Sequence, residues 1–166
     1  MILGMSTYAF TVLHVIISLI GIVTGLIVLF GMFGGNRMSG MMALFLLTTI
    51  LTSVTGFLFP ISGFTPAIGV GILSLVLLAL ALLGLYVFHL AGAWRWIYVV
   101  TAVIALYFNV FVAVVQSFQK LSFLQPLAPT QSEPPFQIAQ GIVLLLFIVA
   151  GVVAVRRFHP QSSAAA

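Results

Sequence analysis

Long apolar runs, separated by short polar or turn-forming segments, dominate the hydrophobic pattern of this chain. A transmembrane helix needs about 20 mostly apolar residues, because each residue adds ~1.5 Å of rise against a hydrocarbon core ~30 Å thick. Stretches of this length cover residues 8–33, 41–59, 67–89, 94–118 and 136–155. Their apolar residues follow one another without the alternation that is typical of barrel strands. The pattern therefore predicts an all-α integral membrane bundle of five transmembrane helices.

Turn-forming residues mark the ends of these predicted helices. Residues 34–40 are rich in glycine and separate the first two runs, and Pro60 follows the second. The third and fourth runs are separated by a short turn around residues 91–93, so we expect a tight antiparallel hairpin. A re-entrant segment would reduce the number of spans to four, but the continuous length of the runs favours five.

The amino-terminal run also has to be distinguished from a secretory signal. It lacks a basic segment before the apolar run and a small-residue cleavage site after it, so we expect the first helix to be retained. We predict a single transmembrane helical domain over residues 1–159. Residues 160–166 are predicted to be a disordered tail.

Composition supports a lipid environment. Charged residues make up 4% of the chain and hydrophobic residues 63%, whereas a soluble surface is roughly 25–35% charged. The net charge of +4 reflects basic residues placed between the apolar runs or after the last one, so no nucleic-acid partner is expected. The chain has no cysteine, which excludes disulfides and thiol chemistry. The expected partner is the lipid bilayer.

The basic residues predict an orientation. With five spans, the chain alternates sides so that Arg37, Arg95 and the Arg156-Arg157 pair share one side, and Lys120 and Glu133 share the other. Because Lys and Arg are enriched in cytoplasmic loops, we predict an amino terminus outside and a cytoplasmic carboxyl terminus.

Polar and small residues form stripes on several predicted helices. In the first helix, His14, Ser18, Gly21 and Gly25 are spaced so that they share one face, which suits close helix packing. Polar residues of the second, fourth and fifth helices fall in the same outer half of the bundle. These positions predict a ligand-binding pocket with Lys120 and Glu133 at its mouth. The predicted pocket residues are His14, Ser18, Thr52, Asn109, Gln116 and Gln140.

A simpler interpretation of the same residues stays open. Ser and Thr hydroxyls can donate hydrogen bonds to carbonyls of their own helix, and amides can hold neighbouring helices together. Under this interpretation, the polar stripes stabilise the bundle without binding a ligand.

Catalysis is not predicted. Glu133 is the single acidic residue, and the sequence shows no metal-ligand cluster, nucleophile motif or phosphate-binding loop. His14 and His89 fall at opposite ends of the bundle and His159 falls in the tail, so no two histidines of one chain can hold the same haem iron. Haem held by one histidine, or a quinone near His14, remains an alternative, and a channel or carrier for a small neutral solute is another.

The segment over residues 119–136 is the only long loop. Its prolines make regular structure unfavourable, so we expect either a lid, a docking surface or a spacer. Glu133 in this loop could pair with Lys120 at its start.

The first 60 residues carry a family resemblance. Leu13-His14, the spaced glycines Gly21 and Gly25, the turn at residues 34–37 and the Thr-rich run ending at Gly56 resemble an uncharacterised family of predicted bacterial inner-membrane proteins. This chain has Met38 and Ser39 where that family often has a second histidine. The resemblance implies a multi-pass protein of the bacterial cytoplasmic membrane. Together with the pocket residues, it leads us to expect a non-catalytic binding or accessory subunit, with another membrane subunit or a second copy of itself as partner.

Overall fold

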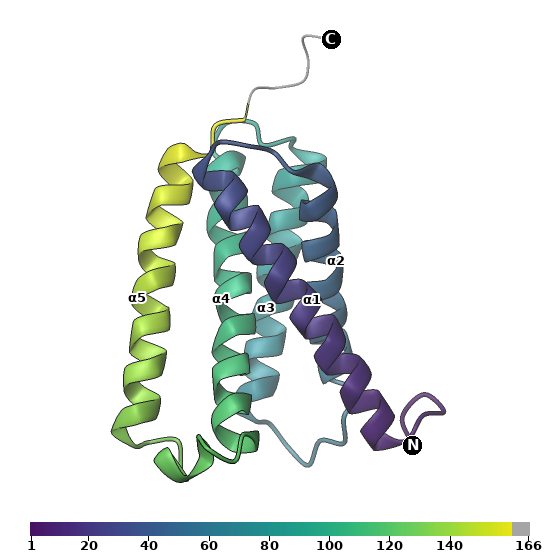
Figure 1. Ribbon diagram of the computed structural model, residues 1–166. Coiled ribbons are helices and arrows are strands. Elements are labelled where there is room, and N and C mark those ends of the chain that lie inside the picture. Colours follow the sequence, from purple (N-terminus) through teal and green to yellow (C-terminus); the bar gives the residue numbers. More distant parts are fainter. Residues whose placement is uncertain (161–166) are drawn as a thin grey trace.

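The computed structural model describes residues 1–160, whose helices form an antiparallel bundle (Figure 1). The long helices are α1 (Thr7–Phe33), α2 (Ser39–Gly56), α3 (Pro66–Leu82), α4 (Trp94–Lys120) and α5 (Pro134–Arg157). A π-helical turn, η1 (Leu83–Val87), extends α3, and a 3-10 turn, η2 (Gln125–Leu127), lies before α5. All five spans are long and apolar enough to cross a membrane. The predicted all-α bundle of five transmembrane helices is confirmed, and the chain is a polytopic membrane protein.

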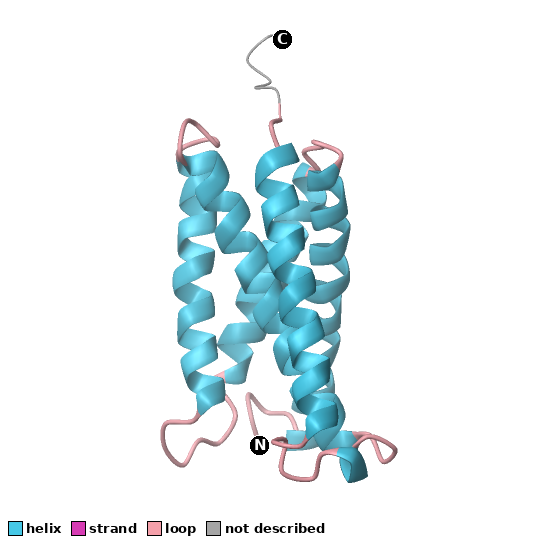
Figure 2. Ribbon diagram, turned by 90° about the vertical axis from the view of Figure 1, so that its left-hand side faces the viewer, coloured by secondary structure: helices cyan, strands magenta, loops and turns pink. Residues whose placement is uncertain are grey.

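A disordered tail was predicted over residues 160–166. Of these, residues 161–166 lie outside the described part of the chain. Within the described residues, the loops gather at the two ends of the bundle and leave its middle entirely helical (Figure 2). This arrangement satisfies the backbone hydrogen bonds inside each segment, as the hydrocarbon region requires.

The two ends of the bundle differ in charge. We call one end the arginine end, because the turns there and the end of α5 carry Arg37, Arg95, Arg156 and Arg157. The opposite end, the loop end, holds the amino terminus, the α2–α3 loop, the α4–α5 loop, Lys120 and Glu133. Which end faces the cytoplasm stays a prediction from the positions of the basic residues.

Caps and turn residues set the helix boundaries. The Ser6 hydroxyl accepts a hydrogen bond from the Ala9 amide at 3.1 Å, and Thr65 accepts one from Ile68 at 3.4 Å. Gly35 has a φ of 71°, a conformation that favours glycine, in the turn after α1. α2 ends at Gly56, three residues before the predicted end, because Pro60 disfavours helical backbone just before it.

The buried core lies in the half of the bundle next to the arginine end. α1 packs along α2, and α3 packs along α4. Phe10 and Phe118 are buried near the loop end, but the main core cluster comes from the other half, and includes Val28, Met32, Met42, Phe45, Leu78, Leu85, Val99 and Leu106. By contrast, no residue of α4 between Tyr107 and Ser117 is fully buried. The loop-end half is therefore the less tightly closed half of the bundle.

Helix α5 stands at the edge of the bundle, beside α4 (Figure 1). Ala154 is its only buried residue. Large apolar side chains such as Ile138, Leu145 and Val149 are more than half exposed on it. In a membrane protein, this surface is built to contact lipid acyl chains or another apolar helix.

Candidate functional site

The imidazole of His14 joins α1 to α2 near the loop end. Its Nδ1 lies 2.7 Å from the Thr55 hydroxyl oxygen. The Thr55 hydroxyl also donates to the Leu51 carbonyl of its own helix, at 2.6 Å. A hydroxyl has one proton; assigning it to the Leu51 carbonyl makes Thr55 the acceptor and assigns the other proton of this contact to Nδ1 of His14.

This tautomer decides what the other ring nitrogen can do. In a neutral imidazole with a proton on Nδ1, Nε2 keeps a lone pair and acts as an acceptor or a ligand. Among the described residues, Nε2 of His14 has no hydrogen-bond partner, and it is not among the fully enclosed polar atoms that lack one. It is therefore open to a group from outside the bundle that can donate a hydrogen bond.

Aromatic rings surround this imidazole. The Phe59 ring stands edge-on to His14, with ring centroids 5.3 Å apart, and Phe10 stands edge-on to Phe59 at 5.0 Å. A Cβ at Gly56 would lie 3.7 Å from the His14 ring, an ordinary van der Waals distance, so this position of α2 is a direct neighbour of the imidazole. The result is one polar nitrogen in an apolar, aromatic setting, a combination that is typical of small-molecule sites.

A second polar cluster holds α1, α2 and α4 together deeper in the bundle. The Asn109 side-chain amide donates to the Thr49 hydroxyl at 3.3 Å. A Cβ at Gly21 would lie 3.3 Å from the Thr48 hydroxyl oxygen and 3.6 Å from the Asn109 amide nitrogen. Gly21 follows His14 by seven residues, so this cluster lies ~10 Å farther along α1 than the imidazole. His14 and Asn109 therefore belong to separate clusters.

The remaining predicted pocket residues lie in different surroundings. Ser18 donates to the His14 carbonyl and Thr52 to the Thr48 carbonyl, each at 2.8 Å, as the simpler interpretation of the hydroxyls predicts. Gln140 donates to the Phe111 carbonyl at 3.2 Å, on the side of α4 that faces α5, and its Oε1 is buried without a partner among the described residues. Gln116 is exposed. Ligand binding by these residues stays a prediction.

The two charged residues predicted at the mouth of the pocket, Lys120 and Glu133, lie in different surroundings. Lys120 ends α4 and is exposed. The Glu133 carboxylate accepts hydrogen bonds within its own loop, from the Thr130 hydroxyl at 2.7 Å, the Thr130 amide at 3.2 Å and the Ser132 amide at 3.1 Å. These hydrogen bonds, that of the Thr130 hydroxyl above all, lower the pKa of Glu133 below its ordinary value. The acid thus organises the turn that leads into α5.

The histidines do not meet in space. His14 lies toward the loop end, whereas His89, with a φ of 48°, lies in the turn between η1 and α4 at the arginine end. His159 follows α5 at that same end. Among residues 1–160, no group of three or more His, Cys, Asp or Glu side chains lies close enough to hold a metal ion. His14 is thus the single histidine in the loop-end half of the described bundle.

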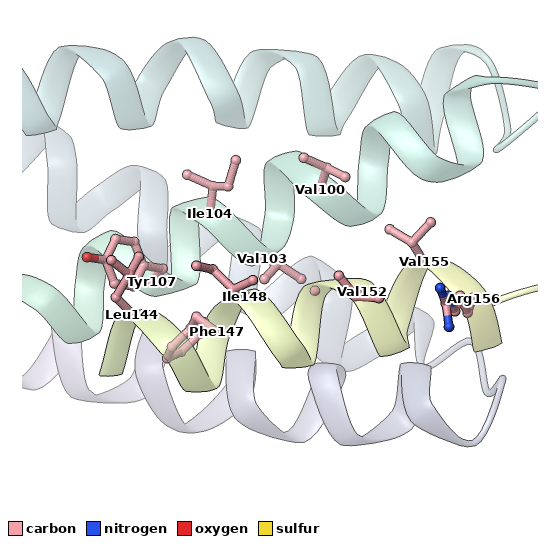
Figure 3. A pocket seen from close by; sticks show the side chains of 11 residues that line it. Val100, Val103, Ile104, Tyr107, Leu144, Phe147, Ile148, Val152, Val155 and Arg156 are labelled. Atoms are coloured by element: carbon pink, nitrogen blue, oxygen red, sulfur yellow. The ribbon is translucent and has the colours of Figure 1, made fainter. Parts of the chain in front are cut away.

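An apolar groove of about 390 Å³ lies between α4 and α5 in the half next to the arginine end (Figure 3). Its walls are aliphatic and aromatic side chains of both helices, and Tyr107 and Arg156 lie at its two ends. No residue of the polar clusters of α1 and α2 is among those that line it.

Sequence reasoning identified His14 and Asn109 but missed their partners. Thr49 and Thr55 belong to a run of hydroxyl residues in which Thr52 looked equally suitable, and the rotation of α2 selects which of them face α1 and α4. The groove was also missed, because its lining is apolar and does not differ in composition from any lipid-facing surface.

No family model, curated protein or solved structure is significantly similar to this chain. A function is therefore inferred from its own residues.

Proposed function

We propose that this polytopic membrane protein is a binding or accessory subunit without catalysis of its own, and that it holds a small, uncharged ligand at His14. One observation carries the proposal: Nδ1 of His14 is engaged by the Thr55 hydroxyl, and Nε2 has no partner among the described residues. With the Thr55 proton assigned to the Leu51 carbonyl, the Nε2 lone pair remains for a ligand. The ligand must donate a hydrogen bond, and the rings of Phe10 and Phe59 favour one with an apolar body.

The absence of a reacting group supports binding rather than catalysis. Glu133, the chain's single acid, is engaged in the α4–α5 loop. The hydroxyls of Ser18 and Thr52 donate to carbonyls of their own helices, and neither is hydrogen-bonded to the imidazole. A nucleophile needs a base within hydrogen-bond reach and a group that orients this base. Among the described residues, the Thr55 hydroxyl lies within reach of the His14 imidazole, but no second group is hydrogen-bonded to Nε2 to orient that base.

Loss of a bound mass tests the proposal. The protein would be purified in mild detergent from its native membrane and examined by native mass spectrometry. We expect a bound small molecule on the wild-type protein and on the control His89→Leu, and its loss from His14→Leu. His89 is a matched control because it is an exposed histidine at the opposite end. Equal retention by His14→Leu and the control would refute the site.

A redox role is the second candidate, and the same nitrogen favours it. A hydroxyl of a reduced quinone donates to an acceptor such as Nε2, and a neutral imidazole nitrogen is also a haem ligand. A visible spectrum of the same sample separates the cases. A Soret band that His14→Leu abolishes, or a quinone in the organic extract that the same substitution removes, would place the redox role first.

A channel or carrier for a small neutral solute has less support. The interior next to the arginine end is closed where Gly25 meets its neighbours: a Cβ there would lie 2.5 Å from Leu106 and 2.8 Å from Phe45. A continuous water path would have to open this packed contact.

We also propose that the protein resides in a bacterial cytoplasmic membrane with its arginine end in the cytoplasm. The positions of Arg37, Arg95, Arg156 and Arg157 support the orientation. The location rests on the resemblance read from residues 13–56 of the sequence, which no family model matches. A separate membrane subunit or a second copy of this chain is the proposed partner, and co-purification from cross-linked membranes would identify it.

A further inference from the structure

The groove between α4 and α5 has the length of one membrane leaflet. Its α5 wall extends from Leu144 to Arg156, which is ~18 Å at ~1.5 Å per residue. Half of a hydrocarbon core is ~15 Å thick. Tyr107, at the deep end of the groove, is also the middle residue of α4. The groove therefore runs from near the centre of the bundle to the headgroup level at the arginine end (Figure 3).

Contacts at both ends of α4 and α5 fix the spacing between these two helices. At the arginine end, Arg95 donates hydrogen bonds to the carbonyls of Val155 and Phe158, each at 2.8 Å. At the loop end, the Phe118 and Phe136 rings pack edge-to-face with their centroids 5.5 Å apart. Between these contacts, aliphatic and aromatic side chains line the groove, and Gly151 is the one small residue among them; a Cβ there would lie 3.6 Å from Val103. The groove is thus a feature of the fold.

The charges around the groove mark one end of it. The Arg156 side chain lies at the mouth at the arginine end (Figure 3). Arg157 is the next residue in the sequence, and Arg95 is hydrogen-bonded to the Val155 carbonyl of α5. Glu133, the chain's single acid, lies at the opposite, loop end. A guanidinium binds phosphate oxygens with paired hydrogen bonds. The groove therefore combines an apolar wall of leaflet length with a phosphate-binding group at the headgroup level.

We infer that the groove binds one anionic phospholipid of the leaflet at the arginine end, with an acyl chain between α4 and α5 and the phosphate at Arg156. The guanidinium at its mouth favours an occupant with an anionic headgroup over an apolar helix of another chain, which is ~10 Å across. A single acyl chain is a narrower occupant that suits the groove's shape. This site is independent of His14, which lies in the other half of the bundle.

The test measures lipid retention by native mass spectrometry. The delipidated protein is incubated with equal amounts of a phosphatidylglycerol and a phosphatidylcholine that carry the same acyl chains. We expect the wild type to retain one phosphatidylglycerol with a preference of about fivefold or more over phosphatidylcholine, the factor typical of one basic residue at an anionic membrane surface. In Arg156→Gln we expect this preference to fall about fivefold, while Arg157→Gln, the adjacent arginine outside the groove lining, keeps most of it.

A second pair of variants tests the acyl-chain position. Gly151→Leu places a side chain in the groove, and we expect it to reduce retention of both lipids at least fivefold. Gly141→Leu is the control, because a Cβ at Gly141, outside the groove lining, would meet nothing within 4 Å. Circular dichroism and gel filtration verify the fold of each variant. The Arg156 pair decides the question even where Gly151→Leu fails to fold, because Arg156 is exposed.

Three results would overturn the inference. Equal retention of the two lipids by the wild type would remove the phosphate contact. An unchanged preference in Arg156→Gln would place the headgroup elsewhere. A dimer mass that carries no lipid and disappears in Gly151→Leu would assign the groove to a second copy of the chain.

Discussion

Arg95 shows how one residue has both a topological and a structural role. In the sequence it marks a predicted cytoplasmic turn. In the structure its guanidinium donates to two carbonyls at the end of α5, those of Val155 and Phe158. Carbonyls at the end of a helix have no partner within the helix, and a positive charge there also interacts favourably with the helix dipole. Arg95 therefore attaches the most exposed helix to the bundle.

We expect Arg95→Met to destabilise the protein by ~1.5–3 kcal/mol, because it removes charge-assisted hydrogen bonds and leaves carbonyls without a partner. Thermal unfolding in detergent measures the effect. Arg37→Met is the control, since Arg37 is an exposed arginine in the turn after α1 at the same end. Equal shifts in the two variants would show that the hydrogen bonds of Arg95 contribute nothing specific.

Tyr98 carries a hydroxyl that the fold does not use. The residue is completely buried, and its hydroxyl has no hydrogen-bond partner among the described residues. An unsatisfied buried polar group costs ~1–3 kcal/mol. We therefore expect Tyr98→Phe to leave the unfolding temperature unchanged or to raise it. A clear decrease would show that the hydroxyl has a partner, such as a buried water molecule.

Two glycines in different helices show how helix packing depends on local space. The small-residue stripe of α1 was predicted to support close packing, and at Gly25 this is confirmed. A Cβ there would lie 2.5 Å from Leu106 and 2.8 Å from Phe45, too close for either side chain to stay in place. By contrast, a Cβ at Gly141 in α5 meets nothing within 4 Å.

We expect Gly25→Ala to destabilise the bundle by ~1–3 kcal/mol through overpacking. Gly141→Ala should be neutral or stabilising by up to ~1 kcal/mol, because alanine favours helix without a steric cost here. Unfolding midpoints of the two variants, measured in the same detergent, give the comparison. A neutral Gly25→Ala would mean that Leu106 and Phe45 can move aside.

The loop before α5 depends on the ionised form of Glu133. Hydrogen bonds from Thr130 and Ser132 favour the carboxylate, which lowers the pKa of Glu133 below its ordinary value of 4.5. Because the folded-state pKa is depressed, the contribution to stability is present above pH 4.5 and is lost as the pH falls through the lowered pKa. We expect wild-type stability to decrease in this acidic range and Glu133→Gln to reduce the pH dependence. The measurement is the unfolding temperature between pH 3 and pH 7, and identical pH profiles would contradict the role.

At the scale of the whole molecule, polarity and packing divide the bundle into two halves. The hydrophobic core lies next to the arginine end, and the His14–Thr55 and Asn109–Thr49 contacts lie in the half toward the loop end or near the middle. This division follows from where bulky side chains and hydroxyls occur along each antiparallel helix. It also places the proposed ligand and lipid sites in different halves.

The predicted orientation can be tested on the intact protein. A reporter that fluoresces only in the cytoplasm, fused after the last residue, should be bright, and the same reporter inserted in the α4–α5 loop should be dark. The physical reason is the excess of arginine at one end, which favours retention on the cytoplasmic side. The opposite pattern would reverse the assignment and would place the proposed lipid in the outer leaflet.

Parts of the candidate site could be predicted, and parts could not. His14 stands out in the sequence as an ionisable group in an apolar run, and Asn109 as an amide in another. Their partners could not be chosen, since residues 48, 49, 52 and 55 are all threonines and the rotation of α2 decides between them. Gln140 was grouped with these residues because it was expected at a similar depth in the membrane. It contacts the Phe111 carbonyl on the side of α4 that faces α5, and depth alone does not predict on which side of a helix a residue lies.

The sequence by itself determined the number of spans and their approximate limits, because membrane thickness demands a minimum length of apolar helix and turn residues interrupt it. It also determined which end is rich in arginine. Only the tertiary structure decided which hydroxyl faces His14, that Arg95 binds the end of α5, and that α4 and α5 leave a groove between them. In lipid, apolar surface does not specify its own partner, so helix rotation and spacing depend on small residues and a few hydrogen bonds.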